Sequence, residues 1–271
     1  GTVTGNMTAL TTVAGSSTTF GLTTIGGNLS VNSAGYIHQN AGITVAGATI
    51  LNSGGVMSLS STANRFTGAA SISSVGNMFV AGNMTGNLTT QTTGAGSYTY
   101  FGLTSVGGNL SVNSAGYISQ AVAGINVVGT TNLNSGGVIS LVYLTNDFAG
   151  AATATGTGVS LADNVGGLLL GNISATGNLS LNSRGGAISQ NAGTSVVAAG
   201  TSTLKADNGL GTTYAINLTN AGNNFGGSVS ATGKGISLTD LNTLSAVLND
   251  AGSSSLTSAG SQNVSGTVTG N

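Results

Sequence analysis

The sequence predicts an all-β protein folded as a single-stranded parallel β-helix, or β-solenoid, with about 20 residues in each coil. Three observations predict it: long phrases recur along the chain, apolar residues alternate with Ser and Thr inside each phrase, and Gly and Asn stand between the phrases. Of the 271 residues, 47 are glycine and none is proline. Proline would delete a backbone donor wherever a strand pairs on both sides, so its absence fits stacked strands.

The longest repeat is GGNLSVNSAGYI, which occupies 26–37 and recurs at 107–118, with a looser copy at 176–193. Two further phrases follow the copies. The first of these phrases is LNSGGVMSL at 51–59, which recurs as LNSGGVISL at 133–141. The second occurs three times, as NRFTGAAS at 64–71, NDFAGAAT at 146–153 and NNFGGSVS at 223–230. We interpret residues 1–271 as one continuous solenoid segment with three degenerate repeats near 6–86, 87–165 and 166–265.

Each phrase predicts a strand because apolar and small polar residues alternate with a period of two, as in Leu29-Ser30-Val31. Ile139, Val159 and Leu179 begin the same pattern at equal intervals, each one coil long. The Gly and Asn of NSAG, NSGG and NSRGG are expected to adopt positive φ at tight turns. The run 238–250 also alternates, and we expect a strand there.

Stacking places each strand beside its copy in the next coil, about 4.8 Å away, so about thirteen coils would extend about 60 Å. The crossover preference of parallel strands favours a right-handed solenoid. Phe66, Phe148 and Phe225 recur at one phase, and Phe20 and Phe101 match each other, so we expect these rings inside the core.

The hexapeptide GTVTGN stands at both 1–6 and 266–271. We expect the segment to be one period of a longer tandem array, in which neighbouring copies cover the end coils. Chance recurrence in a sequence of low complexity is the alternative.

Charge is almost absent, with four Lys and Arg, five Asp and no Glu. We expect no nucleic-acid partner, because so few cations cannot neutralise phosphates. We expect no membrane-spanning helix, because no apolar run approaches the length of about 18 residues that a bilayer requires. There is no Cys for a thiolate metal site, and no Asp follows the Gly-Gly pairs as calcium-binding solenoid turns require. We therefore expect no metal and no cofactor.

The ionisable residues do not form a catalytic pattern, so we expect no enzyme activity and no catalytic residue. They are scattered between phrases: Asp147, Asp163, Asp207, Asp240, Asp250, Arg65, Arg184, Lys205 and Lys234. Lys205 and Asp207 should form an exposed pair, and His38, the only histidine, should be solvated. Regular Thr rows, which an ice-binding face needs, do not recur at coil spacing.

Two features are candidate contact sites. Nine Asn-x-Ser/Thr sequons occur, and Asn28, Asn109 and Asn178 are possible glycosylation sites. The alternative is that Asn ends each turn and the alternating Ser or Thr begins the next strand. Tyr98 and Tyr100 replace Ser17 and Thr19 of the first copy, so they could form an exposed aromatic pair that contacts sugars or proteins.

The segments LTNAGNNFGGSVSATGKGISLTD at 218–240 and LGNISATGNLSLNSRGGAISQ at 170–190, with the GNLSVNSAGYISQ phrases, resemble haemagglutinin-type repeats. Such repeats build the right-handed β-helical shafts of filamentous-haemagglutinin-like adhesins, which Gram-negative bacteria export by two-partner secretion or as autotransporters. The resemblance implies a secreted, cell-surface shaft module for attachment, aggregation or biofilm. Its partners would be neighbouring copies, end-to-end or side-by-side, and host or matrix glycans. A carbohydrate-binding or carbohydrate-degrading β-helix is the alternative function.

Overall fold

A computed structural model of the chain describes residues 1–121 and 123–270. The described residues form strands joined by short turns, with no helix among them. The chain divides into two compact units, Gly1–Gly137 and Val138–Asn271. Each unit is a parallel β-solenoid in its own right, so the predicted fold class is confirmed.

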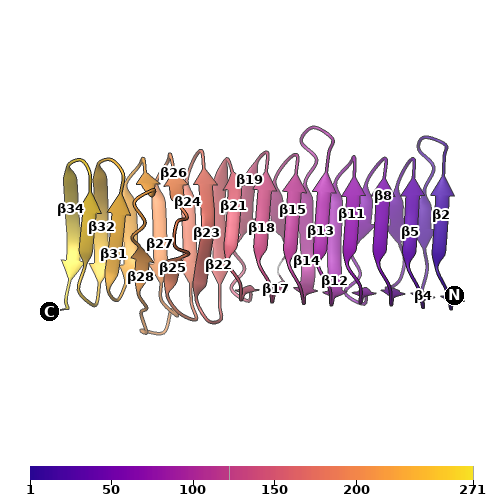
Figure 1. Cartoon of the computed structure of the whole chain (residues 1–271), viewed down its shortest axis with the longest axis horizontal. Helices are drawn as coiled ribbons and strands as arrows, with labels where there is room; N and C mark the ends of the chain where they lie inside the picture. The colour runs from indigo at the N-terminus through magenta and orange to yellow at the C-terminus, as the bar shows by residue number, and fades with distance from the viewer. Residues whose placement is uncertain (122, 271) are drawn as a thin grey trace. The chain divides into compact units, whose positions relative to one another are not determined.

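In the first unit, two sheets face each other across the core (Figure 1). One sheet contains β2 (Met7–Thr11), β5 (Leu29–Ser33), β8 (Thr49–Ser53), β11 (Ala70–Ser74), β13 (Leu88–Thr92), β15 (Leu110–Ser114) and β18 (Thr131–Ser135). The other contains β1 (Thr2–Val3), β3 (Thr18–Phe20), β4 (Thr23–Ile25), β6 (Ile37–Gln39), β7 (Ile43–Val45), β9 (Met57–Leu59), β10 (Arg65–Phe66), β12 (Met78–Met84), β14 (Thr99–Val106), β16 (Ile118–Gln120) and β17 (Ile125–Val127).

The second unit is built in the same way. One sheet contains β21 (Ala152–Gly156), β23 (Leu168–Ala175), β25 (Ile188–Gln190), β26 (Val196–Ala198), β28 (Ile216–Leu218), β29 (Asn224–Phe225), β31 (Ile236–Asp240) and β33 (Ser255–Ser258). The other contains β19 (Val138–Leu141), β20 (Asp147–Phe148), β22 (Gly158–Asp163), β24 (Leu179–Ser183), β27 (Ser202–Ala206), β30 (Val229–Gly233), β32 (Leu244–Asp250) and β34 (Gln262–Val268). The predicted strand at 238–250 is thus two strands, β31 and β32, with a short turn between them.

The strands pair in parallel and in register, which confirms the predicted coil length. Leu29 pairs with Thr49, and Thr49 pairs in turn with Ala70, so successive strands of one sheet are a single turn apart in the sequence. In the second unit the step from Ile188 to its partner Ile216 is longer, because a loop closed by the bridge between Asp207 and Thr213 leaves the coil there.

Apolar side chains from alternate positions of each strand fill the core. One inward column of the first unit runs through paired, buried residues: Val31, Leu51, Ile72, Thr90, Val112 and Leu133. The five phenylalanines expected inside are all buried. Since each strand covers the same side chain of the coil before it, apolar residues must recur at coil spacing.

The Ser of each NSAG and NSGG turn points inward and binds backbone oxygens. The Ser53 hydroxyl donates to Gly35 O at 2.7 Å, and the Ser33 hydroxyl donates to Tyr36 O at 3.1 Å. Gly35 O also accepts from Gly55 N, and Tyr36 O also accepts from Thr18 N, so each hydroxyl is a second donor to its carbonyl. These hydrogen bonds give the buried hydroxyls a partner at the corner.

The expectation of positive φ in these turns is wrong. The glycines of NSAG, NSGG and NSRGG all lie outside the positive-φ set, and no described non-glycine residue has positive φ. Close approach of the neighbouring coil requires glycine instead. A Cβ on Gly54 would lie 2.3 Å from Ala34 O, and one on Gly35 would lie 2.0 Å from Ser16 O.

We therefore expect Gly54→Ala to lower the free energy of unfolding by about 1–3 kcal/mol, because the backbone of the adjacent coil must move away. Gly21→Ala is the matched control, since a Cβ there meets no atom within 4 Å. Urea denaturation of both variants checks this. Equal midpoints for the two variants would contradict it.

Buried asparagines form the corner at the start of three Asn-x-Phe motifs, at 64–66, 146–148 and 223–225. Asn64 exchanges two hydrogen bonds with the Gln39 amide, at 2.9 Å each. Its Oδ1 also accepts from Ile43 N at 3.0 Å, and its Nδ2 donates to Leu59 O and Ala81 O at 3.2 and 3.0 Å. Asn223 and Gln190 form the same reciprocal pair, at 3.0 and 2.7 Å, in the second unit. Each side chain thus joins several backbone segments inside the core.

The third copy of the long phrase falls on a different sheet from its predecessors. In the first unit the phrase strand β5 and the strand β9 lie on opposite sheets. In the second unit β24, the counterpart of β5, continues the ladder of β19, the counterpart of β9. Ile139 pairs with Val159 and Val159 with Leu179, so these residues stack on successive turns as predicted.

Candidate functional site

Four aromatic side chains form a cluster on the outer surface of the first unit. Phe79 of β12 and Tyr100 of β14 are register partners, with ring centroids 5.8 Å apart. Tyr98 packs edge-on against Phe79 at 5.7 Å and stacks on Tyr117 at 4.4 Å, with ring planes 11° apart. Alternation along the strands places the four rings outward; we call them the aromatic cluster. Their neighbours along the chain point inward and are buried: Met78, Val80, Thr99, Phe101 and Ile118.

A hollow of about 210 Å³ adjoins the aromatic cluster. It is lined by Ser60, Phe79, Val80, Ala81, Tyr100, Gly102 and Ala121. The register between β12 and β14 shifts between Val80 and Gly82, where Gly82 has φ +122°. This irregularity and the small residues beside it leave the space next to the Phe79 and Tyr100 rings open.

The Tyr117 phenol of the aromatic cluster stays protonated near neutral pH. Burial raises the pKa of Tyr117 above its ordinary value of 10.0, and the nearby phenols of Tyr98 and Tyr100 raise it further. The Tyr117 hydroxyl can therefore both donate and accept hydrogen bonds.

The predicted pair Tyr98 and Tyr100 is half-buried, because the two side chains pack against other rings. Sequence reasoning missed Phe79 and Tyr117, the latter 41% exposed. The coil spacing could have found both. Phe79 precedes Tyr100 by one turn, and Tyr117 follows Tyr98 by one turn, so each ring falls beside its partner on the next coil.

The sequon asparagines Asn28, Asn109 and Asn178 are exposed, and each also has a structural role. Their Oδ1 atoms accept from backbone N–H groups of the next turn, at 2.8, 2.8 and 3.0 Å; the donors are Ala48, Thr130 and Thr201. The arrangement supports the turn-forming interpretation of the Asn. Glycosylation of these side chains stays a prediction.

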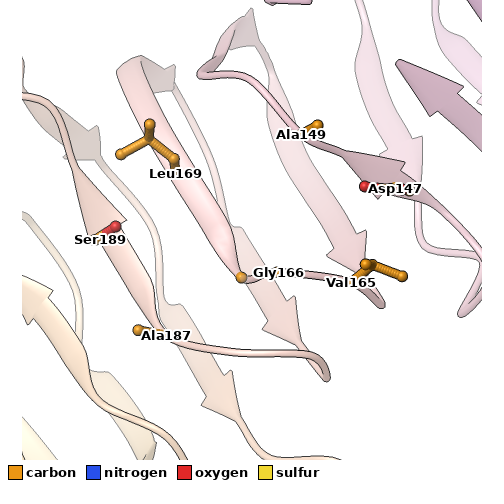
Figure 2. A pocket seen from close by; sticks show the side chains of 8 residues that line it. Asp147, Ala149, Val165, Gly166, Leu169, Ala187 and Ser189 are labelled. Atoms are coloured by element: carbon orange, nitrogen blue, oxygen red, sulfur yellow. The ribbon is translucent and has the colours of Figure 1, made fainter. Parts of the chain in front are cut away.

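A second hollow, of about 430 Å³, lies on the second unit (Figure 2). Figure 2 shows Asp147, Leu169 and Ser189 around it, with Val165 and Gly166 on the turn between β22 and β23. Among the described residues that line it, Asp147 alone is ionisable. In the part of the chain that the structure describes, no three His, Cys, Asp or Glu residues are grouped to hold a metal ion.

Asp163 is fully buried and accepts a hydrogen bond from Val165, one of the residues that line this hollow. The Oδ1 of Asp163 accepts from Phe148 N and Val165 N at 3.3 and 3.4 Å, whereas its Oδ2 has no hydrogen-bond partner among the described residues. Burial raises the pKa of Asp163 to about 6, with nearby Asp147 adding to the rise. Asp163 is a residue that forms a corner of the coil. Asp240 does the same in its own coil, where its Oδ2 accepts from Phe225 N at 3.3 Å.

The other ionisable residues are dispersed. Lys205 Nζ lies 3.4 Å from Asp207 Oδ1, with the lysine side chain 47% exposed, so the predicted pair is present. The His38 ring is half-buried and packs against Tyr36, with centroids 5.6 Å apart. None of the described residues lies in a helix long and apolar enough to cross a membrane.

Three segments of the chain match one family model, at residues 3–73, 85–155 and 156–232. The chain belongs to this family, which is described as "Repeats of unknown function (DUF5649)". No curated protein and no solved structure matches the chain.

Proposed function

We propose that this chain is a structural module in the shaft of a large secreted bacterial adhesin or extracellular filament, used in attachment, aggregation or biofilm. The observation that carries the proposal is the unbroken parallel ladder within each unit, for example β5 to β8 to β11 to β13 to β15. A ladder of this kind makes a stiff module, because each coil is held by backbone hydrogen bonds and apolar contacts on both sides. The haemagglutinin-type phrases support an extracellular, cell-surface location in a Gram-negative bacterium.

In this proposal the chain is not an enzyme, and its partners are copies of itself. The net charge of −1 supports association, because neighbouring copies repel one another only weakly.

The last strand supports end-to-end stacking. In β34, Val264 and Val268 are in register with the buried residues Ala246 and Asp250 of β32, so they belong to the inward row. They are nevertheless 45% and 47% exposed. A further coil would cover them.

The repeated hexapeptide indicates how the strands of one copy would align with those of the next copy. Thr2 and Val3 form β1, which pairs with β4. The matching Thr267 and Val268 lie in β34, while Asn271, which completes the hexapeptide, lies outside the described residues. In a tandem array, β34 of one copy takes the place of β1 in the next copy.

We expect the chain to self-associate end-to-end as its concentration rises, and Val264→Lys to abolish the association by placing a charge in the row that the next coil covers. Sedimentation velocity measures this. Val247→Lys is the matched control, because Val247 on β32 is 47% exposed but points outward and should leave association unchanged. Wild-type chain that stays monomeric at high concentration and low salt would contradict the proposal.

A further inference from the structure

We propose that the aromatic cluster of Phe79, Tyr98, Tyr100 and Tyr117, together with the hollow beside it, is a binding site for a neutral glycan. The site goes beyond the shaft function and does not depend on it.

The shape of the cluster favours sugar rings. Tyr98 and Tyr117 stack nearly parallel, at 11°, and Phe79 and Tyr100 continue the aromatic surface to the rim of the hollow. A pyranose has a face of C–H groups and an edge of hydroxyls. Its face packs on aromatic rings, and its hydroxyls reach the tyrosine hydroxyls.

The charge of the region favours a neutral ligand. Within residues 1–137 the chain has no Asp, Glu or Lys, and Arg65 is the only Arg. Arg65 on β10 pairs with Asn83, which lies farther along β12 than Phe79. A phosphate-bearing or carboxylate-bearing ligand would therefore find almost no cation to bind it.

The size of the site favours one or two sugar rings over a protein partner. The cluster extends over three successive coils, which is about 10 Å along the ladder. Stable protein interfaces involve about 20–30 residues on each side. The hollow of about 210 Å³ has room for about seven water molecules at about 30 Å³ each, which a sugar ring beside Phe79 and Tyr100 would displace.

The first repeat provides an internal comparison. Tyr36 occupies the place of Tyr117 in the first copy of the same phrase and is 43% exposed. Its neighbouring ring is His38, and the residues at the places of Tyr98 and Tyr100 are Ser17 and Thr19. The same coil thus accepts Ser and Thr at these positions, so Tyr98→Ser with Tyr100→Thr should fold.

The test is calorimetric titration of the full chain with cellohexaose, laminarihexaose, maltohexaose and mannohexaose, with tetragalacturonate as an anionic probe. Tyrosine fluorescence is a second readout, since the chain has no Trp. We expect at least one neutral oligosaccharide to bind and tetragalacturonate not to bind. The double variant and Tyr117→Ser should each weaken binding at least tenfold, while Tyr36→Ser should bind as the wild type does.

Circular dichroism and the urea midpoint of each variant establish that it is folded. The proposal is overturned if none of the four neutral oligosaccharides binds, if tetragalacturonate binds as well as they do, or if the folded double variant retains wild-type affinity. Loss of binding in Tyr36→Ser equal to that in Tyr117→Ser would place the site elsewhere and would also overturn it.

Discussion

Replacing Asn64 with alanine is expected to lower the free energy of unfolding by about 3–5 kcal/mol, since several buried groups lose their partners at once. Asn64 is fully buried and joins Gln39, Ile43 N, Leu59 O and Ala81 O. Alanine leaves the N–H of Ile43 and both carbonyls without this partner, and it opens a space at the corner. Urea denaturation followed by circular dichroism measures the loss.

Asn32→Ala is the control for this prediction, because Asn32 is exposed on β5 and should change stability by less than about 0.5 kcal/mol. Hydrogen exchange adds a local test: the amide of Ile43 should lose protection in Asn64→Ala and keep it in Asn32→Ala. If both variants unfold at the wild-type urea concentration, the buried amide does not contribute to the fold as we describe.

Replacing Asp163 with asparagine is expected to stabilise the protein at pH 7–8. The Asp163 carboxyl is buried, and its Oδ2 has no hydrogen-bond partner in the part of the chain that the structure describes. Burial raises its pKa to about 6 from an ordinary 3.8. The folded state therefore binds the proton more tightly than the unfolded state does. The protonated carboxyl therefore contributes to the free energy of unfolding. This contribution is fully present below about pH 4 and is lost as the pH rises through about 6, a change of about 3 kcal/mol.

Asparagine keeps an oxygen for Phe148 N and Val165 N and has no charge to bury. The free energy of unfolding of Asp163→Asn should therefore vary less between pH 4 and 7 than that of the wild type. Denaturation curves at half-unit pH intervals measure the difference. A variant with the wild-type pH dependence, or one that is less stable at pH 7.5, would refute the interpretation.

Asp250→Asn is the matched control, with the opposite sign. Burial opposes ionisation of Asp250, but hydrogen bonds from the Ser254 hydroxyl and from Gly252 N, Gly235 N and Ile236 N hold the pKa below its ordinary value. The ionised carboxylate contributes stability above about pH 4, which is lost as the pH falls through the lowered pKa. Asparagine at this position should destabilise the protein at pH 7.

The sequence predicts the solenoid well because stacking repeats one environment at every turn. Ile139, Val159 and Leu179, which are equally spaced in the sequence, pair as this period requires. The expectation that the turn glycines adopt positive φ is wrong. Glycine is required there, as at Gly54, because the neighbouring coil comes close, and this contact is visible only in three dimensions. The same holds for Asn64, whose buried partners lie on several turns.

The candidate site was predicted only in part. Tyr98 and Tyr100 stood out because they differ from Ser17 and Thr19 of the first copy. The coil spacing places Phe79 one turn before Tyr100 and Tyr117 one turn after Tyr98, but the packing of the four rings against one another is visible only in three dimensions. The hollow depends on the irregularity at Gly82, which no repeat in the sequence marks.

Electron cryomicroscopy of the native source material tests the central claim most directly, that parallel coils continue from one copy to the next. We predict filaments with an axial spacing of about 4.8 Å and a longer axial repeat of about 60 Å, one for each copy of the chain. Short isolated particles without either repeat would contradict it.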